Sequence, residues 1–296
     1  MSQAPLKIAV PNKGALSEGA AAMLVAAGYR QRSDGRELVL VDAANDVEFY
    51  YLRPRDIAVY VGEGTLDLGI TGRDMLLDSG TAAREIMELG FGASTFRFAG
   101  PAGANLTLAG LAGKRIATSY PGVLEAHLRG NGVEARLITL DGAVESAIRL
   151  GVADAIADVV ETGSTLRRAG LELFGEPILQ SQAILIARPD RSDSAPLVAG
   201  APVVAEAVGH LRARLQGVIV ARDFVLMDYD IPDARLEAAQ KLTPGLEGPT
   251  VSPLAKPGWS AVRALVPRAN TQPLMDDLWE VGARAILITE LSACRL

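Results

Sequence analysis

The feature that most constrains the fold is a regular alternation of short apolar segments with amphipathic ones. Residues 6–10 are a strand-like run, and after the turn at 11–14 apolar residues recur every three to four positions until Gly28 ends the helical pattern. Further strand-like runs at 66–70 and 155–160 are each followed by a Thr-Gly turn and a helical segment. This alternation predicts α/β lobes with mostly parallel sheets.

The pattern changes towards the end of the chain. A polar, proline-containing break at 188–202 precedes a predicted helix at 203–215. The elements expected after Gly217 are a strand at 218–230, a helix at 232–241, two strands flanking the Pro- and Gly-rich stretch 253–259, a helix at 271–282 and a strand at 285–290. A βαββαβ order within about 80 residues is the ferredoxin-like arrangement, so a separate terminal domain is expected.

Composition excludes several classes of function. The chain has 296 residues and a net charge of -6, which disfavours binding to nucleic acid or to an anionic membrane. No apolar run approaches the roughly 18 residues of a membrane span, and the first ten residues lack the core of a secretory signal, so a cytoplasmic location is expected. One cysteine, Cys294, and two histidines, His127 and His210, exclude an intramolecular disulfide and a Cys-rich zinc site and disfavour a multi-histidine metal centre.

The strongest local motif runs from Asp158 to Thr165. A buried-type strand carries Asp158 and is followed by the sequence Glu-Thr-Gly-Ser-Thr at the expected start of a helix. Free backbone N–H groups, the helix dipole and hydroxyl donors suit a phosphate monoester, and Gly163 lets the backbone approach it closely. Asp158 can accept hydrogen bonds from ribose hydroxyls. The alternative is an ordinary capped helix, but the acid and the loop together favour a sugar-phosphate site.

Charged residues mark two other strand-to-helix junctions. Lys13 follows the first strand, at the edge where open α/β sheets bind ligands, although the loop is not a Walker A motif. Arg53 and Arg55 bracket Pro54 at a helix start, where a cation opposes the helix dipole and an anionic partner is therefore indicated. Arg73 and Asp74 follow the Thr-Gly turn of another strand. A solvated lysine and surface ion pairs remain the alternatives.

Five segments together resemble the ATP phosphoribosyltransferase family, in its long form and especially its actinobacterial members. They are residues 10–14 (VPNKG), 49–55, 69–74 (GITGRD), 141–145 (DGAVE) and 153–165. The resemblance implies two lobes folded like periplasmic solute-binding proteins, with lobe I formed by 1–94 and 178–211 and lobe II, with the phosphoribosyl pyrophosphate loop, by 95–177. It also implies a C-terminal ferredoxin-like regulatory domain at 212–296.

The same resemblance implies an activity. Family members carry out the first step of histidine biosynthesis, a Mg²⁺-dependent transfer of phosphoribosyl from phosphoribosyl pyrophosphate to N1 of ATP that releases pyrophosphate. They are inhibited by histidine and form hexamers built from dimers. No cluster of carboxylates reads as a metal cage in this chain, so Mg²⁺ is expected to arrive on the substrate phosphates.

Site residues are carried over by position. The catalytic residues are expected to be Lys13, Arg53 and Asp158. Phosphoribosyl pyrophosphate is expected at Asp158, Glu161, Thr162, Gly163, Ser164 and Thr165. ATP is expected at Lys13, Arg53, Asp74 and Tyr120, and histidine at Asp230, Leu246, Thr250 and Ala285. Close relatives often have Ser where this chain has Gly248, which leaves the strength of inhibition open.

The residue inventory suits this reaction. Adenine N1 already carries a lone pair, so no nucleophilic side chain is required. In an oxocarbenium-like transition state the leaving pyrophosphate gains negative charge. Mg²⁺, Lys13 and arginines can offset that charge. Three alternatives are a solute-binding receptor, for which no export signal is visible, a cytoplasmic amino-acid sensor, and a phosphoribosyltransferase with another nucleophile. The threonine loop alone does not exclude the last of these, but the resemblance of the rest of the chain does.

Overall fold

A computed structural model describes residues 5–160, 163–189 and 202–295, without the side chains of 202–205. The chain divides into two compact units. Unit 1 comprises residues 1–22 and 29–208, and unit 2 comprises 23–28 and 209–296. Each unit is described by itself.

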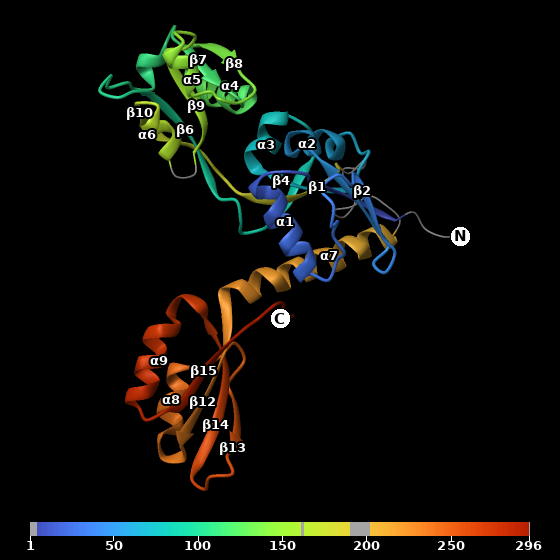
Figure 1. Ribbon diagram of the computed structural model, residues 1–296, viewed down its shortest axis with the longest axis vertical. Coiled ribbons are helices and arrows are strands. Elements are labelled where there is room, and N and C mark those ends of the chain that lie inside the picture. The colour runs from blue at the N-terminus through green and yellow to red at the C-terminus, as the bar shows by residue number, and fades with distance from the viewer. Residues whose placement is uncertain (1–4, 161–162, 190–201, 296) are drawn as a thin grey trace. The chain divides into compact units, whose positions relative to one another are not determined.

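Unit 1 contains a six-stranded sheet with the strand order β2-β3-β1-β4-β11-β5 (Figure 1). Its strands are β1 (Leu6–Pro11), β2 (Val39–Asp42), β3 (Val47–Leu52), β4 (Leu68–Gly72), β5 (Arg84–Glu88) and β11 (Ala183–Ala187). The central strands β3, β1 and β4 are parallel, whereas β2, β11 and β5 pair antiparallel. Its helices are α1 (Ala15–Ala26), α2 (Pro54–Gly62) and α3 (Arg73–Ser79). We call this part the first lobe.

Apolar residues on two helices fix the packing of the first lobe. In α2, Ile57, Ala58 and Val61 are fully buried and pack in one cluster with residues of β1, α3 and β11. The close fit of α2 on β4 depends on Gly69, because a Cβ there would lie 2.5 Å from Cγ2 of Ile57. Pro54 at the first position and Asp56 in the first turn begin α2 as the sequence predicts.

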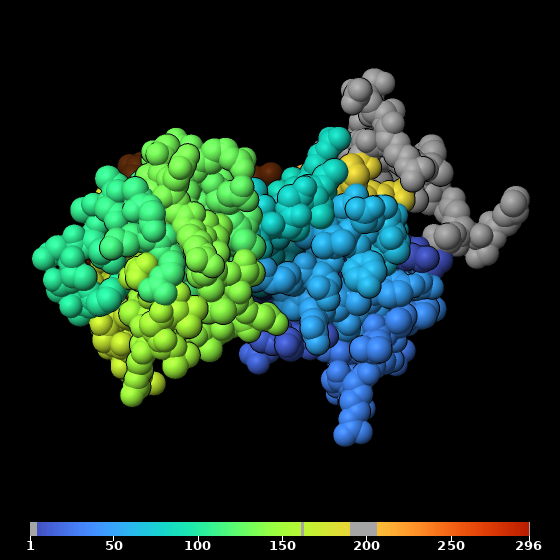
Figure 2. Space-filling model, turned by 90° about the horizontal axis from the view of Figure 1, so that it is seen from above, coloured from blue at the N-terminus to red at the C-terminus, as the bar shows by residue number. Residues whose placement is uncertain are grey.

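The second sheet of unit 1 has the order β10-β6-β9-β7-β8. Its strands are β6 (Ser94–Pro101), β7 (Arg115–Thr118), β8 (Arg136–Thr139), β9 (Ala155–Val160) and β10 (Leu171–Ser181), and its helices are the single-turn η1 (Ala109–Leu111), α4 (Pro121–Gly130), α5 (Ser146–Arg149) and α6 (Ser164–Arg168). Strands β9, β7 and β8 are parallel, and β6 and β10 are antiparallel. We call this part the second lobe; Figure 2 shows the two lobes as adjoining blue and green bodies.

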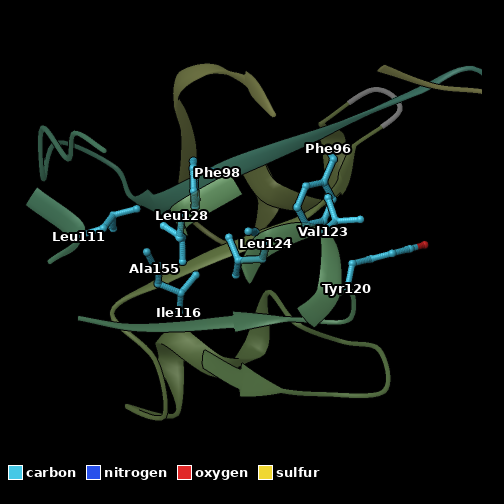
Figure 3. Packing of buried hydrophobic residues seen from close by; sticks show 10 residues of the cluster. Phe96, Phe98, Leu111, Ile116, Tyr120, Val123, Leu124, Leu128 and Ala155 are labelled. Atoms are coloured by element: carbon cyan, nitrogen blue, oxygen red, sulfur yellow. The ribbon is translucent and has the colours of Figure 1, made fainter. Parts of the chain in front are cut away.

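The core of the second lobe lies between its sheet and α4 (Figure 3). Leu124 and Leu128 of α4 pack against Phe96 and Phe98 of β6. Strands β6 and β10 run between the two lobes in Figure 1, so the chain leaves the first lobe along one and returns along the other.

Unit 2 contains a four-stranded antiparallel sheet with the order β13-β14-β12-β15. Its elements in chain order are β12 (Phe224–Pro232), η2 (Asp233–Arg235), α8 (Leu236–Leu242), β13 (Thr250–Pro253), β14 (Trp259–Pro267), η3 (Arg268–Asn270), α9 (Thr271–Glu280) and β15 (Arg284–Glu290). Alternate residues of β12 are buried, including Met227 and Tyr229, and they form a core with Ala239 of α8 and Leu278 of α9. The order βαββαβ and this strand order define a ferredoxin-like domain.

One expected element is wrong. Residues 218–223 belong to the end of helix α7 (Pro202–Asp223) and not to a strand, which begins only at Phe224. The β-branched run after Gly217 suggested a strand, but the buried residues Leu211, Leu215 and Val218 follow a helical spacing. Gly217 lies inside the helix. The position requires glycine because a Cβ there would be 2.0 Å from the backbone oxygen of Cys294. A close contact, not a helix end, therefore accounts for this glycine.

The predicted fold class is confirmed: two α/β lobes with parallel-centred sheets and a C-terminal ferredoxin-like domain. The proposed domain boundaries stay a prediction. Within the described residues, no helix combines the length and apolar character that a membrane crossing requires.

A buried hydroxyl chain gives a stability prediction for unit 2. The hydroxyls of Tyr229 and Thr243 are 2.7 Å apart, and Thr243 Oγ1 donates to the Ala239 carbonyl at 3.2 Å. Thr243→Val keeps the shape of the side chain but leaves the buried Tyr229 hydroxyl without its hydrogen-bond partner. The free energy of unfolding in urea should therefore fall by about 1–3 kcal/mol. Thr289→Val, on an exposed position of β15, is the control. Equal stability of the two variants would show that this bond contributes nothing.

Candidate functional site

A cavity of about 570 Å³ in unit 1 is lined by both lobes. The first lobe contributes the loop after β1 with the start of α1, the end of β4, and the starts of α2 and α3. The second lobe contributes Tyr120, Asp141 and Val159. The charged lining residues are Lys13, Arg53, Arg55, Asp56, Asp74 and Asp141. Parallel strands β1 and β4 end here, as expected for a ligand site in an open α/β sheet.

Three cations border this cavity. Lys13 lies directly after Asn12, which continues from β1, and Gly14 adopts a φ of +78° as the chain turns into α1. Arg53 is the N-cap residue of α2, and Arg55 lies in its first turn. Arg55 forms an ion pair with Asp78 at 2.8 Å. Across the described parts of the chain, neither Lys13 nor Arg53 has an ion-pair partner, so both cations are available to an anion.

Asp74 and Tyr120 form the buried side of the cavity. Asp74 is only 4% exposed, and its Oδ1 accepts a hydrogen bond of 2.7 Å from the Ser181 hydroxyl. The Asp74 backbone N–H in turn donates to Ser181 Oγ at 3.0 Å. Tyr120 packs at the edge of the second-lobe core with its hydroxyl directed away from the cluster (Figure 3). Burial, and then the Asp74 carboxylate, raise the pKa of Tyr120 far above its usual range, so Tyr120 remains a hydrogen-bond donor.

A second cavity, of about 350 Å³, lies at the motif after β9. Asp158, Gly163, Ser164 and Thr165 line it together with Glu145. Gly163 takes a left-handed conformation with a φ of +67° immediately before α6, which a residue with a Cβ adopts only under strain. Two residues of the predicted loop, Glu161 and Thr162, lie outside the described residues.

Asp158 has a strongly shifted pKa. Burial raises it to about 6, the neighbouring Glu145 carboxylate acts in the same direction, and the Val159 N–H, which donates to Oδ1 at 2.8 Å, partly opposes the shift. The Arg55 guanidinium also favours the ionised form. A carboxyl with such a pKa beside a cavity is a frequent mark of a functional site.

The structure groups the predicted residues into two adjoining places. Lys13, Arg53, Asp74 and Tyr120 line the larger cavity, whereas Asp158 and the described loop residues line the smaller one. Val159 lines both cavities, so the two sites are neighbours.

Several residues that line these cavities or hold them in place are not among the site residues carried over from the family. The sequence singles out Arg55 together with Arg53, as cations beside a helix-starting proline, but only Arg53 is assigned to the site. Asp141 and Glu145 belong to a segment that follows β8 and contains Gly142 with a φ of +95°. Ser181 had no local signal, because it reaches Asp74 across 107 positions of the chain.

The predicted histidine residues lie in two places on unit 2. Asp230 pairs with Arg284, next to Ala285, where β12 meets β15. Thr250 opens β13 at the other edge of the sheet, and Leu246, which is exposed, precedes it. Strand β14 separates the two groups. Gly248 has a φ of +143°, so a serine there would require a different backbone.

Two α/β lobes, three cations near strand ends and a strand–glycine–helix turn beside a half-buried carboxyl are the features of a protein class that binds phosphate-bearing ligands. Comparisons with known proteins specify the class further. The family model "ATP phosphoribosyltransferase" matches residues 53–217, and the model "HisG, C-terminal domain" matches residues 221–293.

Whole-chain relatives agree with the family models. An ATP phosphoribosyltransferase of Arthrobacter sp. (strain FB24) is 59% identical over 291 residues, and that of Kocuria rhizophila is 60% identical over 291 residues; each match covers 98% of this chain and all of the relative. A solved structure, the ATP phosphoribosyl transferase (HisG:HisZ) complex from Thermotoga maritima, is 28% identical with a TM-score of 0.58 and covers 71% of this chain and 98% of that one. The chain belongs to the ATP phosphoribosyltransferase family.

Membership places the chain among the pentosyltransferases, at the first step of histidine biosynthesis. The family uses a metal ion. No group of three or more His, Cys, Asp or Glu side chains that could hold a metal occurs in the part of the chain that is described. That the ion is held by ligand phosphates stays a prediction.

Proposed function

We propose that this chain transfers phosphoribosyl from phosphoribosyl pyrophosphate to N1 of ATP, giving phosphoribosyl-ATP and pyrophosphate. The observation that carries the proposal is the junction of the two cavities at Val159. One cavity offers the half-buried carboxyl of Asp158 and a glycine turn, and the other offers three cations and a tyrosine donor. Two phosphorylated substrates bound there would meet at the junction.

Phosphoribosyl pyrophosphate is assigned to the smaller cavity. Its 5-phosphate would accept hydrogen bonds from the hydroxyls of Ser164 and Thr165 and from the backbone near Gly163. Glu161 and Thr162 complete the proposed loop. Ionised Asp158 would accept hydrogen bonds from the ribose hydroxyls and thereby fix the orientation of C1.

ATP is assigned to the larger cavity, with Lys13, Arg53, Asp74 and Tyr120 around it. In the reaction the N1 lone pair forms the bond to C1 while the bond from C1 to pyrophosphate oxygen breaks, and pyrophosphate leaves with that electron pair. Lys13 and Arg53, and Arg55 beside them, would offset the charge that develops on the leaving group. Mg²⁺ on the phosphates would supply further charge stabilisation.

The test is a direct assay. Purified protein is mixed with ATP, phosphoribosyl pyrophosphate, Mg²⁺ and pyrophosphatase, and the absorbance of the adenine adduct is followed with and without histidine. Adduct formation is the expected result. If no adduct forms while histidine still binds, the transferase function is wrong and an amino-acid sensor takes its place.

Regulation by histidine is a second part of the proposal. The two groups lie towards opposite edges of one sheet, with Ala285 on edge strand β15 beside Asp230 of β12 and Thr250 on edge strand β13, so two copies placed edge to edge would bring them together. This arrangement supports a homo-oligomer, for which we propose the family's dimer-based hexamer. A cytoplasmic location also stays a prediction.

Asp230 gives a test of the regulatory proposal. Asp230→Asn removes a charge that would pair with a cationic group of histidine, so the histidine concentration for half inhibition should rise about tenfold or more with unchanged basal turnover. Asp228→Asn is the matched control, because Asp228 lies on the same face of β12 and is paired with Arg263 at 2.7 Å. Equal effects of the two substitutions would remove Asp230 from the effector site.

A further inference from the structure

One carboxylate of the first lobe makes direct contacts with a helix of the second lobe. Asp78 lies near the end of α3, and its side chain is 8% exposed. Its Oδ1 accepts hydrogen bonds from the backbone N–H groups of Gly122 at 2.8 Å and Val123 at 3.3 Å. These are the second and third residues of α4, which Pro121 begins.

Asp78 replaces the local cap that α4 lacks. The first N–H groups of a helix need acceptors, which an N-cap side chain usually provides to the second or third residue. The N-cap residue of α4 is Tyr120, whose side chain makes no capping hydrogen bond. An anionic group at this end is also favoured by the helix dipole. The cap of α4 therefore comes from the other lobe.

The contact is tight enough to require a glycine. A Cβ on Gly122 would lie 2.6 Å from the backbone oxygen of Asp78 and 3.3 Å from its Oδ1. No side chain can occupy that space unless α3 and α4 move apart. Because α3 belongs to the first lobe and α4 to the second, Gly122 and Asp78 together define how closely the lobes approach at this point.

The same carboxylate reaches the larger cavity through Arg55. Asp78 Oδ2 forms the ion pair with Arg55 Nη1 at 2.8 Å, and the Arg55 guanidinium carbon lies 4.7 Å from the centre of the Tyr120 ring. Tyr120 immediately precedes the helix that Asp78 caps. Asp78 thus holds two groups that contact each other in the cavity, one from each lobe.

We propose that Asp78 is a positioning residue: it sets the spacing of the two lobes and thereby places Tyr120 and Arg55 at the ATP cavity. The assignment of that cavity rests on the proposed function. Asp78 itself lies outside the lining of both cavities. Its loss should therefore affect steps that need both lobes and spare binding to the second lobe alone.

Three variants and a control separate this role from general damage. Asp78→Ala removes the cap and the ion pair, Asp78→Asn keeps a neutral acceptor of the same shape, and Gly122→Ala forces the helices apart with every charged group retained. Glu125→Gln is the control, because Glu125 lies on α4 in an exposed ion pair with Arg129. Asp78→Asn also covers the case in which the alanine variant fails to fold.

The expected result is a split between the substrates. Asp78→Ala and Gly122→Ala should lower kcat/KM for ATP by about 10- to 100-fold, as displacement of positioned groups does, and Asp78→Asn should have a smaller effect. The Kd for phosphoribosyl pyrophosphate alone, measured by calorimetry, should change by clearly less than kcat/KM for ATP does, because the cavity proposed for its ribose and 5-phosphate belongs entirely to the second lobe. Glu125→Gln should match the wild type in both measurements.

Amide hydrogen exchange supplies a readout that does not depend on turnover. The N–H groups of Gly122 and Val123 should be protected in the wild type and exchange faster in Asp78→Ala. Unprotected amides in the wild type, unchanged kinetics in both alanine variants, or an equal loss of affinity for phosphoribosyl pyrophosphate would each overturn the proposal. Protected amides in a wild-type protein without turnover would instead contradict the proposed function and leave the capping contact intact.

Discussion

Asp158→Asn is expected to remove most of the turnover and to stabilise the protein at pH 7. The ionised carboxylate is proposed to hold the ribose hydroxyls, and an amide accepts hydrogen bonds less strongly. The value of kcat/KM for phosphoribosyl pyrophosphate should fall by about 100-fold. In the wild type the same parameter should decline below about pH 6, where Asp158 becomes protonated. Initial rates across pH measure both effects.

The stabilising effect follows from the raised pKa. Burial raises the pKa of Asp158 to about 6, whereas an unfolded aspartate titrates near 3.9. Between these values the native state binds more protons than the unfolded state, so stability falls as pH rises through this window. The loss reaches about 1–3 kcal/mol at pH 7. Asn carries no charge, so urea unfolding of the variant should lack this decline and show higher stability at pH 7.

Asp154→Asn is the matched control for the stability effect. Asp154 lies just before β9, and its hydrogen bonds with Arg115 lower its pKa to about 2. Its contribution has the opposite sign: the stability is present above the unfolded pKa and is lost as pH falls towards 2. Asp154→Asn should therefore destabilise slightly at pH 7 and leave turnover unchanged. If Asp158→Asn and the wild type show parallel stability curves, the burial argument is wrong.

Lys13→Met is expected to lower kcat/KM for ATP by about 100- to 1,000-fold. Lys13 is exposed at the border of the larger cavity and has no ion-pair partner in the described part of the chain. Its ammonium can therefore stabilise phosphate charge that increases as pyrophosphate leaves. Met retains the aliphatic length and removes only the charge. Because Lys13 is exposed, the free energy of unfolding should change by less than about 0.5 kcal/mol. Initial rates and urea unfolding test the two statements.

A lysine away from the cavities gives the comparison. Lys114 is exposed just before β7, and Lys114→Met changes the net charge by the same amount. We expect a large fall in kcat/KM for ATP in Lys13→Met and little change in Lys114→Met, at both low and physiological ionic strength. Similar rates would mean that Lys13 acts only through the overall charge of the protein, and its place at the reaction centre would be lost.

Local patterns predicted most of the fold because each strand, turn and helix carries its own signal. Pro54, Gly28 and the apolar spacing in α1 are examples that the structure matches closely. The error at residues 218–223 arose because β-branched residues suit a buried helix as well as a strand when tertiary contacts decide. Gly217 was misleading for the same reason, since its role is a contact with a segment 77 positions away.

The same distinction between local signals and long-range contacts applies to the site residues. Lys13 and Arg53 stand at strand–helix junctions, and Asp158 lies near the end of β9 just before such a junction, so all three positions are visible in the sequence. The residues that hold the site together are not, because Ser181 reaches Asp74, and Asp78 reaches Gly122, only after the two lobes have formed. Their side chains are ordinary in sequence, and their importance arises from contacts across 107 and 44 positions.

Strands β6 and β10, which run between the two lobes, bring the two ends of the second lobe together. Ser94 at the start of β6 faces Ser181 at the end of β10 in the strand pairing, so the polypeptide enters and leaves this lobe at neighbouring points. The second lobe is thus a closed loop of chain inserted into the first. Residues 94–181 therefore have adjacent ends, the arrangement expected of a segment inserted into another domain, although α4 within it takes its cap from Asp78 of the first lobe.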